Sequence, residues 1–133
     1  KILGVHRPLP ASPTELRRLI EKGLPKASLG HVVSYVVAHP GDAAAVRDHL
    51  IPPATYKRRT RTLKADESER VERLARVMAL AEDAFGSADD ARTFLATPHP
   101  ELDGERPLDA ARTELGARQI EEILWRMEYG LPA

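Results

Sequence analysis

Hydrophobic positions recur at intervals of three and four along most of the chain, which is the spacing of one face of an α-helix. Over residues 66–85 the principal stripe consists of Val71, Leu74, Met78, Ala81 and Phe85. Val77, Leu80 and Ala84 widen this stripe to about half of the helix circumference. We therefore expect a long helix that is covered on two sides and forms the spine of the molecule.

Helix-capping residues divide the remainder of the chain into short helices. Ser12 before Pro13 and Glu15 predicts a helix start, and Gly23 ends that helix. Asp66 with Glu69 reads as a capping box for the long helix, and Ser87 caps a helix through residue 95. Further helices are predicted over 43–50, 54–60, 107–115 and 117–129, with Gly116 as a break between the last two. Residues 31–38 also suit a strand, but no second strand candidate could pair with them, so a helix is expected and the fold class is all-α.

The last predicted helix carries aromatic residues on an unexpected face. Ile120, Ile123, Leu124 and Met127 form its apolar stripe, whereas Trp125 and Tyr129 lie on the opposite side. Exposed aromatic side chains of this kind are enriched at protein interfaces. The alternative is a helix that buries both faces within one monomer.

Composition limits the classes of protein that the chain can represent. Its 133 residues are 42% hydrophobic and 30% charged, which is typical of one compact domain or two very small ones. The absence of cysteine excludes disulfides and thiolate chemistry. No apolar run approaches the roughly 20 residues that span a bilayer, and no signal peptide is recognisable. A cytoplasmic protein is expected, and the opening on Lys1 rather than Met suggests that further residues precede it.

The formal net charge of zero hides an asymmetry between the two halves. Residues 1–64 hold twelve Lys and Arg against four acidic residues, a net charge of +8, whereas residues 65–133 carry −8. The basic half suits a polyanion such as nucleic acid. The acidic half should face a basic protein or solvent, so two different partners are predicted.

Residues 42–61 have the form of a helix-turn-helix. Ala43, Val46 and Leu50 would be the inner face of its first helix and Ile51 the buried turn residue, although Leu50 stands where such turns often have glycine. Residues 55–59 would be the recognition helix. The candidate DNA contacts are Thr55, Lys57, Arg58, Arg59 and Arg61. The alternative is a basic loop that contacts only solvent.

Catalysis finds little support in the sequence. The five histidines show no metal-ligand spacing, and no glycine-rich phosphate loop or nucleophile elbow is present. We therefore expect a protein that is not an enzyme and has neither a metal site nor a cofactor.

An ordered set of short motifs then resembles a known family. Glu67–Val77 is followed by Ala84-Phe85-Gly86, Pro107-Leu108-Asp109, Thr113-Glu114, Gly116-Ala117 and the ending Arg126-Met127-Glu128-Tyr129-Gly130. Residues 45–133 resemble the Xre/MbcA/ParS antitoxin family in collinear order, and the preceding part is similar to the Xre-like helix-turn-helix domain of the same antitoxins. Trp125 stands where that family commonly has a small residue, and Pro132 where an aromatic residue is common.

The resemblance implies an antitoxin of a type II toxin–antitoxin system. It implies a helix-turn-helix domain over residues 1–65, which binds operator DNA as part of a homodimer, and a toxin-binding domain over 66–133. The implied toxin has a RES domain and degrades NAD+ or transfers its ADP-ribose. The toxin-facing candidates are Trp125, Arg126, Glu128, Tyr129, Gly130 and Leu131. A stand-alone transcriptional regulator, whose C-terminal domain only dimerises, is the alternative.

Overall fold

The computed structural model describes residues 2–3 and 12–130, and this part of the chain forms helices without any strand. The α-helices are α1 (Pro13–Lys22), α2 (Ser28–Val36), α3 (Ala43–Leu50), α4 (Pro53–Lys57), α5 (Ala65–Phe85), α6 (Ala88–Ala96), α7 (Pro107–Ala110) and α8 (Glu114–Glu128). Two short 3-10 helices, η1 (Pro40–Asp42) and η2 (Pro100–Leu102), precede α3 and α7. The predicted all-α class is confirmed.

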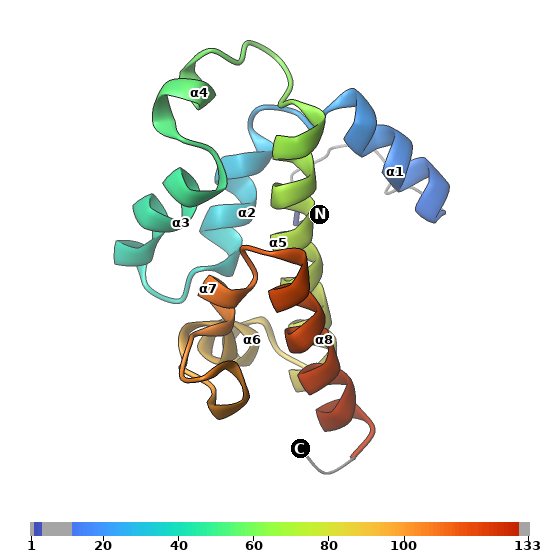
Figure 1. Ribbon diagram of the computed structural model, residues 1–133, viewed down its shortest axis with the longest axis vertical. Coiled ribbons are helices and arrows are strands. Elements are labelled where there is room, and N and C mark those ends of the chain that lie inside the picture. The colour runs from blue at the N-terminus through green and yellow to red at the C-terminus, as the bar shows by residue number, and fades with distance from the viewer. Residues whose placement is uncertain (1, 4–11, 131–133) are drawn as a thin grey trace.

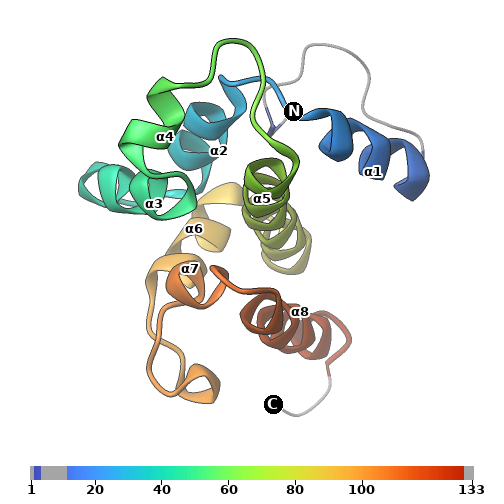
Figure 2. The same ribbon diagram turned by 45° about the horizontal axis from the view of Figure 1, so that its top comes forward.

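Helix α5 is the spine around which the other helices pack (Figure 1). Its 21 residues span about 31 Å. Helices α1, α2, α3, α6 and α8 all contact it, with α1 on the opposite side of α5 from α2 and α3 (Figure 1). Figure 2 shows α2, α3 and α4 together on one side of α5, with α8 on another. The predicted two-sided covering is confirmed, because helices contact α5 from more than one side and Val71, Leu74, Val77, Met78 and Ala81 are buried, whereas Leu80, Ala84 and Phe85 are half-buried.

The ends of several helices follow the predicted capping residues. The Ser12 hydroxyl accepts a hydrogen bond from the Glu15 amide at 3.1 Å, and Ser87 accepts one from the Asp90 amide at 3.0 Å. The ambiguous stretch 31–38 is helical as far as Val36, where α2 ends, and α2 buries Val32, Val33 and Val36 in the core. In these places, residues close together in the sequence determine where a helix begins and which of its faces is buried.

The start of α5 differs from the predicted capping box. The helix begins at Ala65, and the carboxylate of Glu67, not Glu69, accepts the Lys64 amide at 2.8 Å. The reason is long-range, because Leu63 is buried and its amide donates to the Leu24 carbonyl at 2.8 Å. That anchor fixes where the chain can turn into the helix.

The predicted break at Gly116 was wrong. Helix α7 ends at Ala110, and Thr113 caps α8 by accepting the Gly116 amide at 3.0 Å. Gly116 lies in the first turn of α8, and a Cβ there would come within 1.8 Å of the Ala110 carbonyl oxygen. Glycine at 116 therefore permits the close approach of α7 to α8 instead of ending a helix.

A short backbone pairing joins the segment after α4 to the turn between α1 and α2. The Lys26 amide donates to the Arg61 carbonyl at 2.9 Å, beside the Leu63–Leu24 hydrogen bond. Gly23 is required at this junction, because its φ is +98° and a Cβ would lie 2.1 Å from the Leu63 carbonyl oxygen. The pairing fixes the path of the basic segment that follows α4.

Candidate functional site

Helices α3 and α4, with the turn between them, occupy the segment predicted as a helix-turn-helix. Ile51 is fully buried in the turn, as predicted, and Leu50 is buried at the end of α3. The Leu50 carbonyl accepts a hydrogen bond from Arg70 Nε at 2.8 Å, which ties the turn to α5. The helix predicted over residues 55–59 has different bounds in the structure, because α4 covers Pro53–Lys57. Arg58 and Arg59 instead lie in a tighter turn, in which each backbone amide donates a hydrogen bond to the carbonyl three residues earlier.

Four of the five predicted DNA contacts lie on or next to α4 with accessible side chains. Lys57, Arg58 and Arg61 are exposed, and Thr55 is half-buried. Arg58 Nη2 donates to the Thr55 hydroxyl at 3.3 Å. This group offers cations for phosphates and one hydroxyl on a helix that stands at one end of the molecule (Figure 1).

Arg59 has different surroundings from the other four. Its Nε donates to Glu67 Oε1 at 2.8 Å and its Nη2 to Glu67 Oε2 at 2.6 Å. The two side chains are only 14% and 3% exposed. The Arg59 hydrogen bonds lower the pKa of the Glu67 carboxyl to about 2. Arg59 therefore connects the end of the recognition segment to the start of α5, so we assign it a structural role.

Lys26 is a cation near α4 that sequence reasoning missed. Its Nζ lies 4.6 Å from the centroid of the Tyr56 ring, and the Tyr56 hydroxyl donates to the Lys26 carbonyl at 3.3 Å. Tyr56 thus packs α4 against the turn between α1 and α2. The sequence separation of 30 residues leaves no local signal for this contact.

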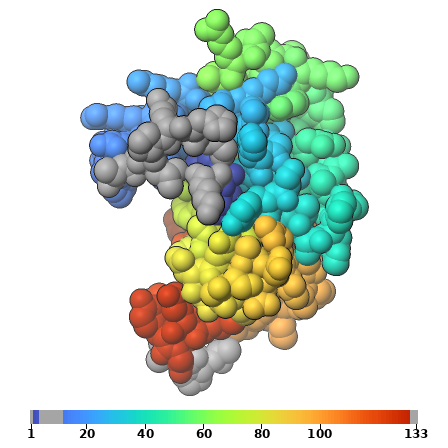
Figure 3. All heavy atoms as spheres, turned by 180° about the vertical axis from the view of Figure 1, so that it is seen from behind, coloured from blue at the N-terminus to red at the C-terminus, as the bar shows by residue number. Residues whose placement is uncertain are grey.

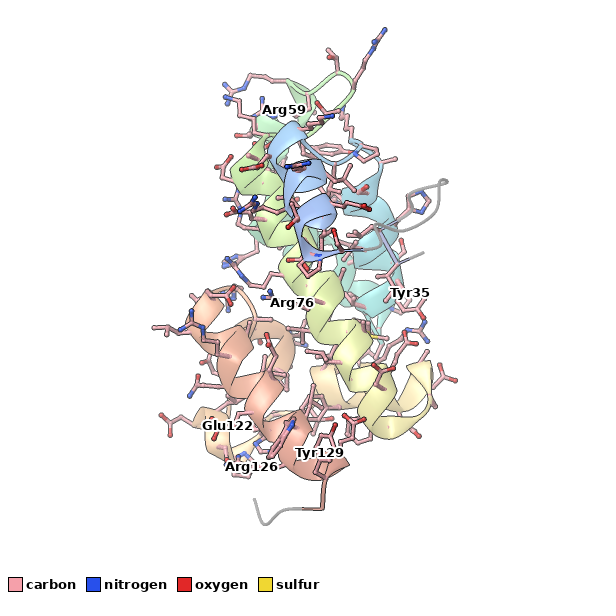
Figure 4. The ribbon with its side chains drawn as sticks, turned by 90° about the vertical axis from the view of Figure 1, so that its right-hand side faces the viewer. Tyr35, Arg59, Arg76, Glu122, Arg126 and Tyr129 are labelled. Carbon is pink, nitrogen blue, oxygen red and sulfur yellow. The ribbon has the colours of Figure 1, made fainter. Side chains whose placement is uncertain are left out.

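The opposite end of the molecule exposes the aromatic residues of α8. Trp125 is 53% exposed and Tyr129 is 62% exposed, and their ring centroids lie 4.9 Å apart. Their predicted position away from the core face is confirmed. Figure 4 shows Tyr129 near one end of the structure and Arg59 near the other. The space-filling view in Figure 3 shows the same separation between the end of α8 and the segment after α4.

Met127 was predicted to lie on the core face of the last helix. It is 44% exposed, so that prediction is wrong. Its helical direction matches that of Ile120 and Ile123, which are buried. Its exposure therefore comes from its position along the axis, since the last turn of α8 extends beyond the residues that cover the earlier turns.

The other predicted toxin-facing residues have varied surroundings. Arg126 is half-buried and forms ion pairs with Glu101 and Glu122, so it holds the loop at η2 against α8. Glu128 and Gly130 are exposed at the helix end. Leu131 lies outside the described residues.

Ion pairs also hold α8 on the spine. Glu114 accepts from Arg73 Nε at 3.3 Å and from Arg76 Nη2 at 3.2 Å, while Arg76 Nε lies 3.6 Å from Glu121. Arg76 is central to this contact, between α5 and α8 (Figure 4). The acidic residues at the start of α8 thus serve the architecture.

The described residues contain neither a cluster of metal-binding side chains nor a membrane-spanning helix. Within residues 2–3 and 12–130, no three His, Cys, Asp or Glu side chains gather as a metal ion would require. Among the helices of the described residues, none is sufficiently long and apolar to cross a membrane.

Two family models match the chain in succession. The model of the antitoxin Xre-like helix-turn-helix domain matches residues 15–76, and that of the antitoxin Xre/MbcA/ParS C-terminal toxin-binding domain matches residues 80–130. The first match ends and the second begins within α5, with residues 77–79 between them. The division between residues 65 and 66 expected from the sequence stays a prediction.

Curated relatives agree with both models. An antitoxin Xre of Pseudomonas putida is 37% identical over 87 residues, which are 63% of this chain and 55% of that protein. An antitoxin Xre of Yersinia enterocolitica is 37% identical over 67 residues, or 50% of this chain and 45% of that protein. The matched part thus spans about half the length of these two relatives. An antitoxin Xre of Photorhabdus laumondii is 29% identical over 125 residues, 91% of this chain and 83% of that protein. The chain therefore belongs to the Xre/MbcA/ParS antitoxin family, with an Xre-like helix-turn-helix domain followed by a C-terminal toxin-binding domain.

Proposed function

We propose that this chain neutralises a RES-domain toxin in the cytoplasm by covering the toxin's active site with its own C-terminal segment. The toxin would degrade NAD+ or transfer its ADP-ribose. The observation that carries this proposal is the end of the toxin-binding domain match at residue 130, directly after the exposed Trp125 and Tyr129. Large, rigid aromatic side chains at a protruding end are well suited to fill a pocket on a partner.

The charge distribution supports a basic binding site on that partner. All eight arginines of residues 65–133 form ion pairs within the chain, namely Arg70, Arg73, Arg76, Arg92, Arg106, Arg112, Arg118 and Arg126. Sixteen acidic residues outnumber these eight arginines, so this half keeps a net negative charge. A site that binds the pyrophosphate of NAD+ should carry cations, and an acidic surface complements such a site.

The basic end of the molecule suits a second partner, operator DNA. In this proposal α4 enters the major groove, with Thr55, Lys57, Arg58 and Arg61 contacting the DNA while Arg59 fixes the recognition segment to α5. A homodimer would place two such units on two half-sites and repress the antitoxin's own operon. Because α4 and the end of α8 lie at opposite ends of the molecule, the two partners need not compete for one surface (Figure 1).

The role proposed for the chain is binding, without catalysis or a cofactor. The chain's own acidic clusters are used in ion pairs between helices, as the contacts of Glu114 and Glu121 with Arg76 show. Consumption of NAD+ by the purified chain alone would contradict this part of the proposal.

The second candidate is a stand-alone transcriptional regulator whose C-terminal domain only dimerises. The exposed pair Trp125 and Tyr129 favours it as well, because a second copy could cover these rings. A reading frame for a RES-domain protein beside this gene favours the antitoxin, and its absence favours the regulator.

Shortening the chain so that it ends at Met127 tests the proposed inhibitory segment. This variant should retain its helical circular dichroism and its affinity for DNA, because Trp125 and the buried Ile123 and Leu124 remain. It should fail to restore growth of cells that express the toxin, whereas the unshortened chain restores it. Full neutralisation by the shortened chain would place the inhibitory contact elsewhere.

A further inference from the structure

The outward face of α8 carries four strongly exposed residues in one line. Leu115 is 72% exposed and Trp125 is 53% exposed; the side chains of Arg118 and Glu122 are 70% and 71% exposed. Their spacing of three, four and three places them on one face of the helix, opposite the buried Ile120. We call these four residues the α8 stripe.

The order of residues in the α8 stripe is self-complementary. From its start to its end the stripe reads apolar, positive, negative, apolar. An antiparallel copy of the same helix reads apolar, negative, positive, apolar, so apolar meets apolar and each charge meets its opposite. The residue numbers agree, since Leu115 with Trp125 and Arg118 with Glu122 both have their midpoint at residue 120.

We propose that the α8 stripe is the contact through which two copies of this chain form a homodimer with two-fold symmetry. Leu115 packs against the Trp125 of the second copy, and Arg118 pairs with the Glu122 of the second copy. Symmetry repeats each contact, as in any isologous interface. Two apolar contacts about 15 Å apart along the axis then flank two central ion pairs.

Other arrangements of the two helices fit the charges less well. A parallel pair in register would place Arg118 against Arg118 and Glu122 against Glu122. The charges are also weakly engaged within their own chain, because Arg118 lies 3.9 Å from Glu114 and Glu122 lies 3.7 Å from Arg126 at the exposed surface. Such exposed pairs contribute little and leave both groups available to a second copy.

This inference rests on the homodimer proposed above and leaves room for the toxin. In the antiparallel register the position opposite Tyr129 is residue 111, which precedes the start of α8 at Glu114. Tyr129 therefore lies beyond the start of the second copy's α8. In this arrangement the contact between copies replaces the toxin-facing role given to Trp125 above, and the exposed Tyr129 remains the aromatic residue that faces the toxin.

Charge reversal in single and mixed variants tests the proposal. Arg118→Glu places two carboxylates together, the new one and that of Glu122 in the other copy, and Glu122→Arg places two arginines together. Each variant alone should therefore dimerise at least about tenfold more weakly than the original chain. An equimolar mixture restores opposite charges at both positions and should form a 1:1 heterodimer. Sedimentation equilibrium measures the dissociation constants, and native mass spectrometry of the mixture, with one variant labelled with ¹⁵N, identifies the heterodimer.

Glu21→Arg is the matched control, because Glu21 is an exposed acidic residue on α1, which lies far from the end of α8 (Figure 1). It should leave the dissociation constant unchanged, and circular dichroism should show that all variants are folded. Single variants that dimerise like the original chain would overturn the α8 stripe as the interface but leave the homodimer itself. Weakened single variants that do not recover on mixing would overturn the antiparallel register. An original chain that is monomeric at all concentrations would overturn the homodimer and this inference together.

Discussion

Two neighbouring arginines of the same sequence motif have different roles in the structure. Arg58 is exposed at the end of α4, whereas Arg59 makes a two-point hydrogen bond to the buried Glu67. The density of basic residues made the whole set predictable as a DNA-contacting group. The separate role of Arg59 was not predictable, because Glu67 lies beyond a turn and resembles any acidic residue in the first turn of a helix.

The salt dependence of DNA binding distinguishes the two arginines. Each phosphate contact contributes about one unit to the slope of log affinity against log salt. Replacing Lys57, Arg58 or Arg61 with Ala should reduce that slope by about one unit, measured by fluorescence anisotropy on duplex DNA from upstream of the gene. Arg59→Ala should leave the slope unchanged and lower the melting temperature instead. A slope that falls equally in Arg58→Ala and Arg59→Ala would contradict this assignment.

The Arg59–Glu67 pair also predicts a pH dependence of stability. The pKa of Glu67 falls from 4.5 to about 2 in the folded chain, so its contribution to stability is present above pH 4.5 and is lost as the pH falls through 2. Glu67→Gln should lower the free energy of unfolding by about 2 kcal/mol at pH 7, since it leaves Arg59 without its partner. Urea titrations of both chains should show this difference shrinking from pH 4.5 downwards. If the difference in free energy of unfolding between the two chains stays constant down to pH 2, the Arg59–Glu67 ion pair is not its source.

At the scale of helices, most elements were predictable where a local signal specifies them. The side chains of Ser12 and Ser87 cap the helices that follow them. The spacing of the apolar residues of α5 predicts which of its faces are buried. The errors arose where distant residues decide the outcome. The start of α5 depends on the backbone hydrogen bond from Leu63 to Leu24. The end of α7 depends on the close approach of the Ala110 carbonyl oxygen to Gly116, which has no Cβ.

Gly116 provides the sharpest test of packing between helices. Gly116→Ala should lower the free energy of unfolding by about 3 kcal/mol, because the new Cβ would lie 1.8 Å from a backbone oxygen that cannot move aside cheaply. Gly30→Ala is the matched control, since Gly30 is helical in α2 and a Cβ there meets nothing within 4 Å. The control should be neutral or raise stability by up to about 1 kcal/mol. Equal effects of the two substitutions in urea denaturation would disprove the close approach.

At the scale of the whole molecule, the separation of charge in the sequence corresponds to a separation in space. The basic α4 segment and the end of α8 lie far apart along α5 (Figure 1), and Arg106 links the two halves by pairing with Asp42 and Asp109. The exposed face with Trp125 was predictable from helical periodicity. The toxin's chemistry was not predictable from periodicity or charge, because it depends on residues of another protein; only the family resemblance suggested it.

Intracellular NAD+ tests the proposed antitoxin role most directly. The adjacent reading frame is expressed alone, with this chain, and with the chain ended at Met127, and NAD+ is measured in each culture. We expect NAD+ to fall with the reading frame alone, to be maintained when the unshortened chain is present, and to fall again with the shortened chain. NAD+ that never falls, or that falls equally with and without this chain, would contradict the proposal that it neutralises an NAD+-consuming toxin.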